Sequence, residues 1–171
     1  MGYGVVRVGA CSRPEYVDMG VLDLRRFKDP YDKLRQIFDF TTNLCRSYGP
    51  TDLAIESPFY GKNAQVIFKL GRAQGAAIVA AEAQGLDVYE YAPRKAKIAI
   101  CGNGAASKEQ VCLMVQKTLG VRINPGHLDA TDALGLAMCH YYQLTNPLLS
   151  SGGGTSSWEK FVASNPDRVK P

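Results

Sequence analysis

The chain has 171 residues, 46% of them hydrophobic, which fits one globular domain and suffices to bury a core. No apolar run approaches the ~20 residues that a membrane helix needs, and the first residues do not resemble a signal peptide. The net charge of +4 is compatible with a nucleic-acid partner without demonstrating one. The five scattered cysteines form no Cys-x-x-Cys pair, which argues against a zinc knuckle or redox motif and favours reduced thiols in the cytoplasm.

The first third of the chain predicts a hairpin, a helix and a strand. Two short stretches, 3–8 and 16–22, are separated by a turn and are expected to pair at the edge of a sheet. Within 29–50 an Asp-Pro pair can cap and open a helix, and a Gly-Pro pair can end it. The apolar run that follows predicts a short strand that ends on Glu56.

The middle and end of the chain alternate between helix and strand signals. A helix is expected over 63–83, whose later half is dominated by small residues, and a strand over 88–91. Pro93 is expected to open a further helical segment. A serine and a glutamine three residues apart predict a capping box for a helix over 107–119, and apolar periodicity predicts a last helix over 128–143.

This order of elements indicates a mixed α/β domain. We expect one parallel or mixed sheet with helices on both faces, formed by residues 1–145. Residues 146–171 begin with a Gly/Ser-rich stretch and are expected to form a flexible tail. Ligand sites in such folds lie at the carboxyl ends of strands.

Three acidic residues are the candidates for chemistry at that edge. Glu56 ends an apolar strand, where a carboxylate is either a metal ligand or general base or a solvated loop residue. Asp129 and Asp132 lie three apart at the start of the last helix and share a face there, so they can hold one divalent cation. Helix capping and the helix dipole also favour acids at this position. Together the three acids suit hydrolysis of a phosphodiester with two Mg²⁺ ions.

The two histidines and the remaining polar motifs give weaker indications of function. His140, two turns beyond Asp132, is a metal ligand, a cation near a helix end or a structural residue, and His127 lies in a predicted loop. Neither forms a convincing Ser/His/Asp triad, and the chain contains no GxxxxGK[ST] phosphate-binding loop.

Four segments, in order and at fitting spacing, together resemble the RuvC-type Holliday junction resolvases. They are GYGVVRV, DLAIESPFYGKNAQVIFKLGRAQG, VYEYAPRKAKIAICGNGAASKEQV and LDATDALGLAMCHYYQ, and the resemblance covers roughly residues 2–143. It implies a ribonuclease-H-like fold and a homodimeric, Mg²⁺-dependent endonuclease that cuts four-way DNA junctions by paired symmetric nicks. It also implies a RuvA–RuvB branch-migration partner.

The resemblance assigns roles to individual residues. Glu56, Asp129 and Asp132 match three of the four acids that form the family's catalytic metal site. Other positions match residues that contact DNA or extend its binding surface: Phe59, Lys97, Lys108, Arg94 and Lys95. Among these, Phe59 would stack on opened bases, and Lys97 and Lys108 would lie near the scissile strand. We interpret the small-residue helix over 71–83 as the dimer contact.

The chain departs from the family pattern at its beginning. The family's first strand, which carries the fourth acid, has no counterpart before the GYG segment. We therefore expect the true start to lie upstream, with Met1 as an internal methionine. Two other readings stay open: a junction-binding protein that cannot cut because this aspartate is absent, and a different ribonuclease-H-like nuclease.

Overall fold

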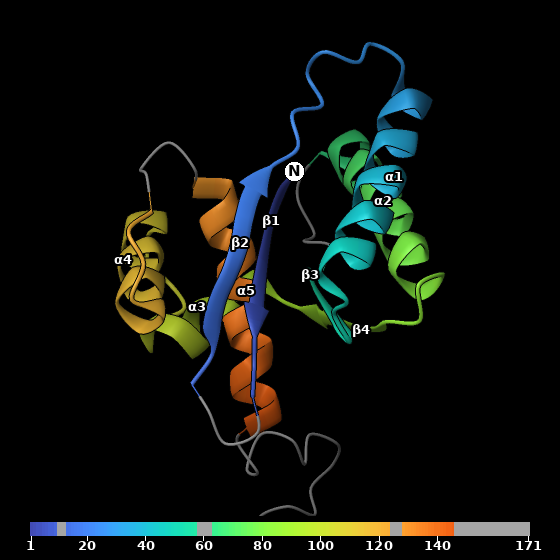
Figure 1. Ribbon diagram of the computed structural model, residues 1–171. Coiled ribbons are helices and arrows are strands. Elements are labelled where there is room, and N and C mark those ends of the chain that lie inside the picture. The colour runs from blue at the N-terminus through green and yellow to red at the C-terminus, as the bar shows by residue number, and fades with distance from the viewer. Residues whose placement is uncertain (10–12, 58–62, 124–127, 146–171) are drawn as a thin grey trace, which may run out of the picture.

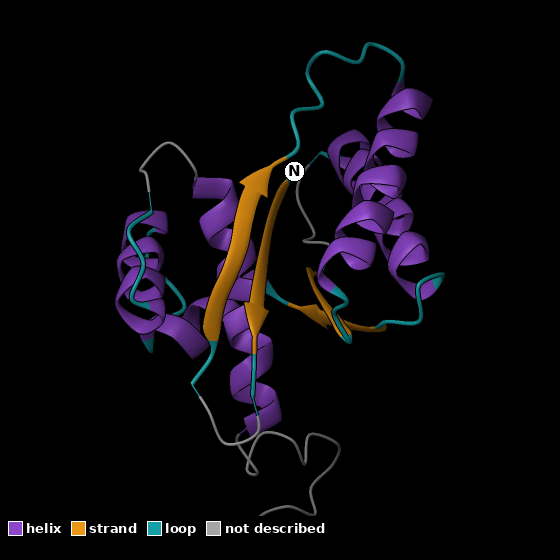
Figure 2. Cartoon of the chain, in the orientation of Figure 1, coloured by secondary structure: helices purple, strands orange, loops and turns teal. Residues whose placement is uncertain are grey.

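The computed structural model describes residues 1–9, 13–57, 63–123 and 128–145 (Figures 1 and 2). The strands in these ranges are β1 Gly2–Arg7, β2 Glu15–Val21, β3 Asp52–Glu56 and β4 Asp87–Tyr91. The helices are α1 Pro30–Tyr48, α2 Ala64–Glu82, α3 Pro93–Cys101, α4 Lys108–Leu119 and α5 Leu128–Thr145. The expected elements therefore all occur, with bounds that differ by one or two residues from those expected.

The strands form two separate ladders in the described part of the chain. β1 and β2 are the expected antiparallel hairpin, with a register irregularity between Val5 and Val6. β3 and β4 pair in parallel, from Asp52 opposite Asp87 to Glu56 opposite Tyr91. No ladder joins β1 to β3 among these residues, so the sheet is divided where a continuous one was expected.

Helix α5 connects the two ladders. It packs along β1 and β2 and also contacts β3, and Figure 1 shows it crossing behind the hairpin. α1 and α2 pack against each other, and α2 contacts β3 and β4. α3 and α4 pack on α5 at the other side of the molecule. The architecture is thus a mixed α/β fold with helices flanking small sheets. This confirms the fold class that the sequence predicted.

Local sequence signals fix the helix ends. The Asp29 side chain accepts a hydrogen bond from the backbone N–H of Asp32, and Gly49 ends α1 in the left-handed conformation, at φ 57°. This conformation costs little for glycine because it lacks a Cβ. The capping box of α4 forms as expected: Ser107 accepts from the Gln110 backbone, and the Gln110 side chain accepts from the Ser107 backbone. Lys108 is consequently held in the first turn of α4.

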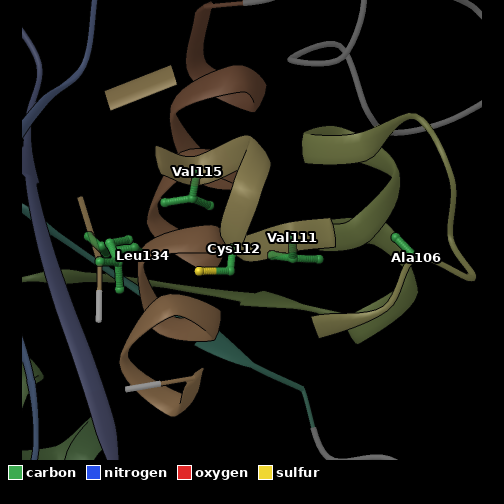
Figure 3. Packing of buried hydrophobic residues seen from close by; sticks show 6 residues of the cluster. Ala106, Val111, Cys112, Val115 and Leu134 are labelled. Carbon is green, nitrogen blue, oxygen red and sulfur yellow. The ribbon is translucent and has the colours of Figure 1, made fainter. Parts of the chain in front are cut away.

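A hydrophobic core joins α4 to α5 (Figure 3). Val111 and Val115 of α4 and Leu134 of α5 are 3%, 1% and 0% exposed. Burying side chains of this size stabilises the fold by about 1.5–3 kcal/mol each. The beginnings of α4 and α5 are therefore packed together, which brings their first polar residues into contact. No helix in the described ranges is long and apolar enough to cross a membrane.

Candidate active site

Glu56 lies at the carboxyl end of β3, as predicted. The side-chain amide of Gln74, on α2, donates a hydrogen bond to the Glu56 backbone carbonyl, and the Ser57 N–H donates to the Tyr91 carbonyl at 2.9 Å. These contacts fix the end of the strand. Partial desolvation raises the pKa of the Glu56 carboxyl, and the negative charge of Asp132 raises it further. Glu56 and Asp132 therefore interact electrostatically, although they are 76 residues apart in the sequence.

The aspartate pair lies in the first two turns of α5. The Asp129 side chain is 67% exposed and that of Asp132 is 34% exposed, while Ala130 and Thr131 between them are buried. β1 approaches this end of the helix closely: a Cβ atom on Gly2 would lie 2.8 Å from the Ala130 backbone nitrogen and closer still to the Asp129 carbonyl. Glycine at position 2 therefore allows the hairpin to support the helix end that carries the pair.

Lys108 pairs with both aspartates. Its Nζ lies 2.8 Å from Oδ2 of Asp132 and 3.6 Å from Oδ1 of Asp129. The hydrogen bond to Asp132 is the main reason that the pKa of Lys108 is raised above its ordinary value. The lysine is therefore charged at neutral pH, and the pair already shares one cation.

Lys97, on α3, completes the electrostatic environment of Glu56. The positive charges of Lys108 and Lys97 both lower the pKa of the glutamate, opposing the effects of desolvation and of Asp132. Thus three predicted acids and two predicted lysines, from β3, α3, α4 and α5, are linked either by ion pairs with Lys108 or by their effects on the pKa of Glu56. Among the described residues, however, no group of three His, Cys, Asp or Glu side chains is arranged closely enough to hold a metal ion.

The other predicted DNA-binding residues lie on α3 or outside the described residues. Lys95 Nζ lies 5.3 Å from the centroid of the Tyr91 ring, in a cation–π contact, and the Arg94 side chain packs beside Gly104. Both residues are exposed. Phe59 falls within 58–62 and His127 within 124–127, which are not described.

The structure shows three further contacts, of which the first two were not foreseen from the sequence. Gln74 supports Glu56, although nothing in the helix pattern distinguishes it from a solvent-facing residue. Asn63 caps α2 by accepting from the backbone N–H groups of Gln65 and Val66, a role that its place before an apolar helix could have signalled. His140 is buried and bonded to Tyr91, which agrees with the structural reading of this histidine.

Comparisons with known proteins identify relatives that match nearly the whole chain. Residues 1–140 match the family model described as Crossover junction endodeoxyribonuclease RuvC. A protein of that name from Bacteroides fragilis is 49% identical, over 99% of this chain and 90% of its own length. One from Porphyromonas gingivalis is 45% identical, over 99% of this chain and 91% of its own length.

Solved structures give the same result. The Thermus thermophilus RuvC structure superposes with a TM-score of 0.73 at 30% identity, over 84% of this chain and 87% of that one. The structure of the T. thermophilus RuvC in complex with a Holliday junction substrate gives a TM-score of 0.75 at the same identity and coverage.

The fold and these neighbours define a ribonuclease-H-like α/β protein. The chain belongs to the RuvC family of crossover junction endodeoxyribonucleases.

Proposed function

We propose that this chain is a Mg²⁺-dependent endonuclease that resolves four-way DNA junctions by paired, symmetric nicks in recombination and repair. The observation that carries the proposal is the electrostatic cluster of Glu56, Asp129, Asp132, Lys97 and Lys108 in a chain of this family. Acids that hold a cation beside lysines that attract a phosphate are what phosphodiester hydrolysis requires.

The aspartate pair fits a divalent cation. Two carboxylates from successive turns already share the Lys108 ammonium, so hard oxygen donors converge on one positive charge there. Glu56 is the third ligand that we propose, and its coupling to Asp132 supports this role. Bound Mg²⁺, one ion or two, would activate water and stabilise the charge that develops on the phosphate.

The chain's own residues supply the remaining functions. Lys108 and Lys97 place positive charge beside the acids, which attracts the scissile phosphate and offsets the charge that accumulates during the reaction.

We propose that α3 extends the DNA-binding surface from the site. Arg94 and Lys95 are exposed on the same helix as Lys97 and form a basic surface that can follow a phosphate backbone. Phe59, close in sequence to Glu56, is proposed to stack on an opened base, an interaction worth about 1–3 kcal/mol.

We propose a homodimer, since paired nicks at a two-fold symmetric junction require two sites. Support comes from the exposed apolar side of α2, where Phe68 is 70% exposed and Val79 is 59% exposed. These two residues are eleven apart, about three turns, and so lie on one stripe of the helix. Ala77, Ala80 and Ala81 in the expected region, 71–83, are buried within the chain itself, so Val79 is the residue of that region that supports the dimer contact.

The cellular context follows from the same assignment. We propose that the resolvase domain spans residues 1–145, that 146–171 are a tail, and that the protein works in the cytoplasm with a RuvA–RuvB branch-migration complex. All four cysteines of the described ranges are free, which suits a reducing compartment.

A substrate panel tests the proposal. The full chain is incubated with Mg²⁺ and a synthetic four-way junction, a linear duplex or an RNA–DNA hybrid, and binding and cleavage are measured for each. We expect cleavage of the junction alone, and its loss in Asp132→Asn with junction binding retained. Preferential cleavage of the hybrid would indicate a different ribonuclease-H-like nuclease and overturn the proposal.

One observation favours a second candidate function, junction binding without cleavage. No three acidic ligands are grouped closely enough among the described residues, and Lys108 occupies the aspartate pair. This candidate predicts tight junction binding with no Mg²⁺-dependent product in the same panel.

A further inference from the structure

A buried polar bridge links α5 to both strands of the parallel ladder: it contains Asp52, at the start of β3, and Tyr91, which lies opposite Glu56 on β4. The Tyr91 hydroxyl lies 2.7 Å from Nδ1 of His140, and these residues are only 5% and 7% exposed. On the other side of the imidazole, Nε2 lies 3.7 Å from Oδ1 of Asp52. The Tyr89 ring covers the imidazole, with ring centroids 4.3 Å apart. Asp52 and Tyr91 therefore hold His140 from the two strands.

The protonation of the bridge follows from its burial. Burial raises the pKa of Tyr91 to about 12, so its hydroxyl keeps its proton and can donate to Nδ1. Burial also lowers the pKa of His140, which the Asp52 carboxylate only partly opposes. A neutral imidazole that accepts at Nδ1 carries its proton at Nε2, directed toward Asp52. Nε2 is buried and makes no hydrogen bond, so Asp52 is its nearest compensating charge.

The spacing of residues on β3 and α5 connects this bridge to the acids. Asp52 and Glu56 are four residues apart on the same face of β3, about 13 Å along the strand. Asp132 and His140 are eight residues apart on α5, about 12 Å along the helix. These lengths match and α5 contacts β3, so the contact between His140 and Asp52 at one end of the strand is compatible with Asp132 lying near Glu56 at the other. The electrostatic coupling of Glu56 with Asp132 agrees with this register.

We propose that Asp52, Tyr91 and His140 are positioning residues that set α5 in register on the β3–β4 ladder and so fix the distance between Glu56 and the aspartate pair. The proposal rests on the proposed function of that site. Apolar side chains would fill the same space without the cost of desolvating polar groups, so packing alone does not account for the bridge. The directional hydrogen bond to Tyr91, together with the ionic contact with Asp52, favours one rotation and one height of the helix, which apolar contacts do not.

The test distinguishes a role in positioning α5 from an effect on the stability of the fold alone. In the double variant Tyr91→Phe/His140→Leu both hydrogen-bonding partners become apolar, so no buried partner is left unsatisfied between them. Asp52 is 26% exposed and remains accessible to water. Mn²⁺ affinity, junction affinity and the single-turnover cleavage rate are measured on the full chain, with thermal unfolding as the check of folding. Met138→Leu, a volume-conserving change in the buried part of α5, is the matched control.

We expect the double variant to lose about 10–100-fold in Mn²⁺ affinity and in the cleavage rate, since contacts that orient the ligands of a metal site commonly contribute this much. Junction affinity should stay within about two-fold, because the DNA-contacting lysines and arginines are unchanged. His140→Gln, which keeps a polar group at this position, should retain more affinity and rate than His140→Leu. A folded double variant that binds Mn²⁺ and cuts like the parent and Met138→Leu would overturn the proposal.

Two further results keep the outcomes distinguishable. If the double variant does not fold, Tyr91→Phe alone removes one hydroxyl and should still slow cleavage several-fold; a parental rate would overturn the inference. If the parent neither binds Mn²⁺ nor cuts, the proposed function has failed. Crystal structures of the parent and of Tyr91→Phe then test the positioning role by itself. Displacement of Asp132 relative to Glu56 would then support the positioning role, and superimposable structures would refute it.

Discussion

Lys108→Met should strengthen divalent-ion binding while weakening cleavage. In the structure the Lys108 ammonium pairs with Asp132 at 2.8 Å and with Asp129 at 3.6 Å, so a metal ion that uses both carboxylates must displace it. The lysine side chain is 51% exposed, and partly exposed ion pairs contribute only about 0.2–1 kcal/mol each. Two such pairs correspond to Mn²⁺ affinity that is about two-fold to thirty-fold higher in the variant.

Cleavage should change in the opposite direction. Without the ammonium, the charge that develops on the phosphate loses a preorganised partner, and such losses typically cost about 100-fold in rate. Isothermal titration with Mn²⁺ and single-turnover cleavage of a four-way junction measure the two effects. Lys117→Met, nine residues and about 14 Å further along α4, controls for net charge. Weaker Mn²⁺ binding in Lys108→Met than in Lys117→Met would refute the competition between lysine and metal.

Three further predictions concern stability and titration. Ser107→Ala should lower the free energy of unfolding by about 1 kcal/mol in urea titrations, through loss of the α4 cap, whereas exposed Thr118→Ala at the other end of this helix should cost less. Because the pKa of His140 is lowered in the folded state, the unfolded chain binds more protons below pH ~6.5. Stability should thus fall on acidification toward pH 5, and less steeply in His140→Gln. Burial and the hydrogen bond to Asp18 raise the pKa of Tyr3 to about 12, and burial does the same for Tyr91, so absorbance titration should show a late-titrating group of tyrosines that contains one fewer in Tyr3→Phe. The associated stability is present below pH ~10 and is lost as the pH rises through about 12.

Local signals in the sequence were sufficient for the elements and for the acids. The Asp-Pro opening of α1, its terminal Gly49 and the capping box of α4 depend on neighbouring residues only, and each forms as predicted. Glu56 was placed at a strand end because a short apolar run stops there. The spacing of Asp129 and Asp132 put both on one face of a helix, and the structure shows one lysine pairing with both.

Features that depend on contacts between distant elements were not predictable in this way. The pairing of Lys108 with the aspartates requires the beginnings of α4 and α5 to meet, which follows from the core around Leu134 rather than from any local pattern. The hydrogen-bond partner of the buried His140 is a tyrosine 49 residues away. The division of the strands into two ladders also reflects long-range pairing, which hydrophobic patterns alone do not determine.

Cleavage of a supercoiled plasmid that extrudes a cruciform tests the central claim most directly. A single nick relaxes the plasmid and removes the four-way junction, so linear product forms only when both strands are cut during one binding event. The account predicts Mg²⁺-dependent linear product from the full chain, and none from Asp132→Asn, which should still bind a synthetic junction. Nicked circles without linear product would contradict paired cleavage by a dimer, and junction binding with no product at all would contradict the assignment of this chain as a nuclease.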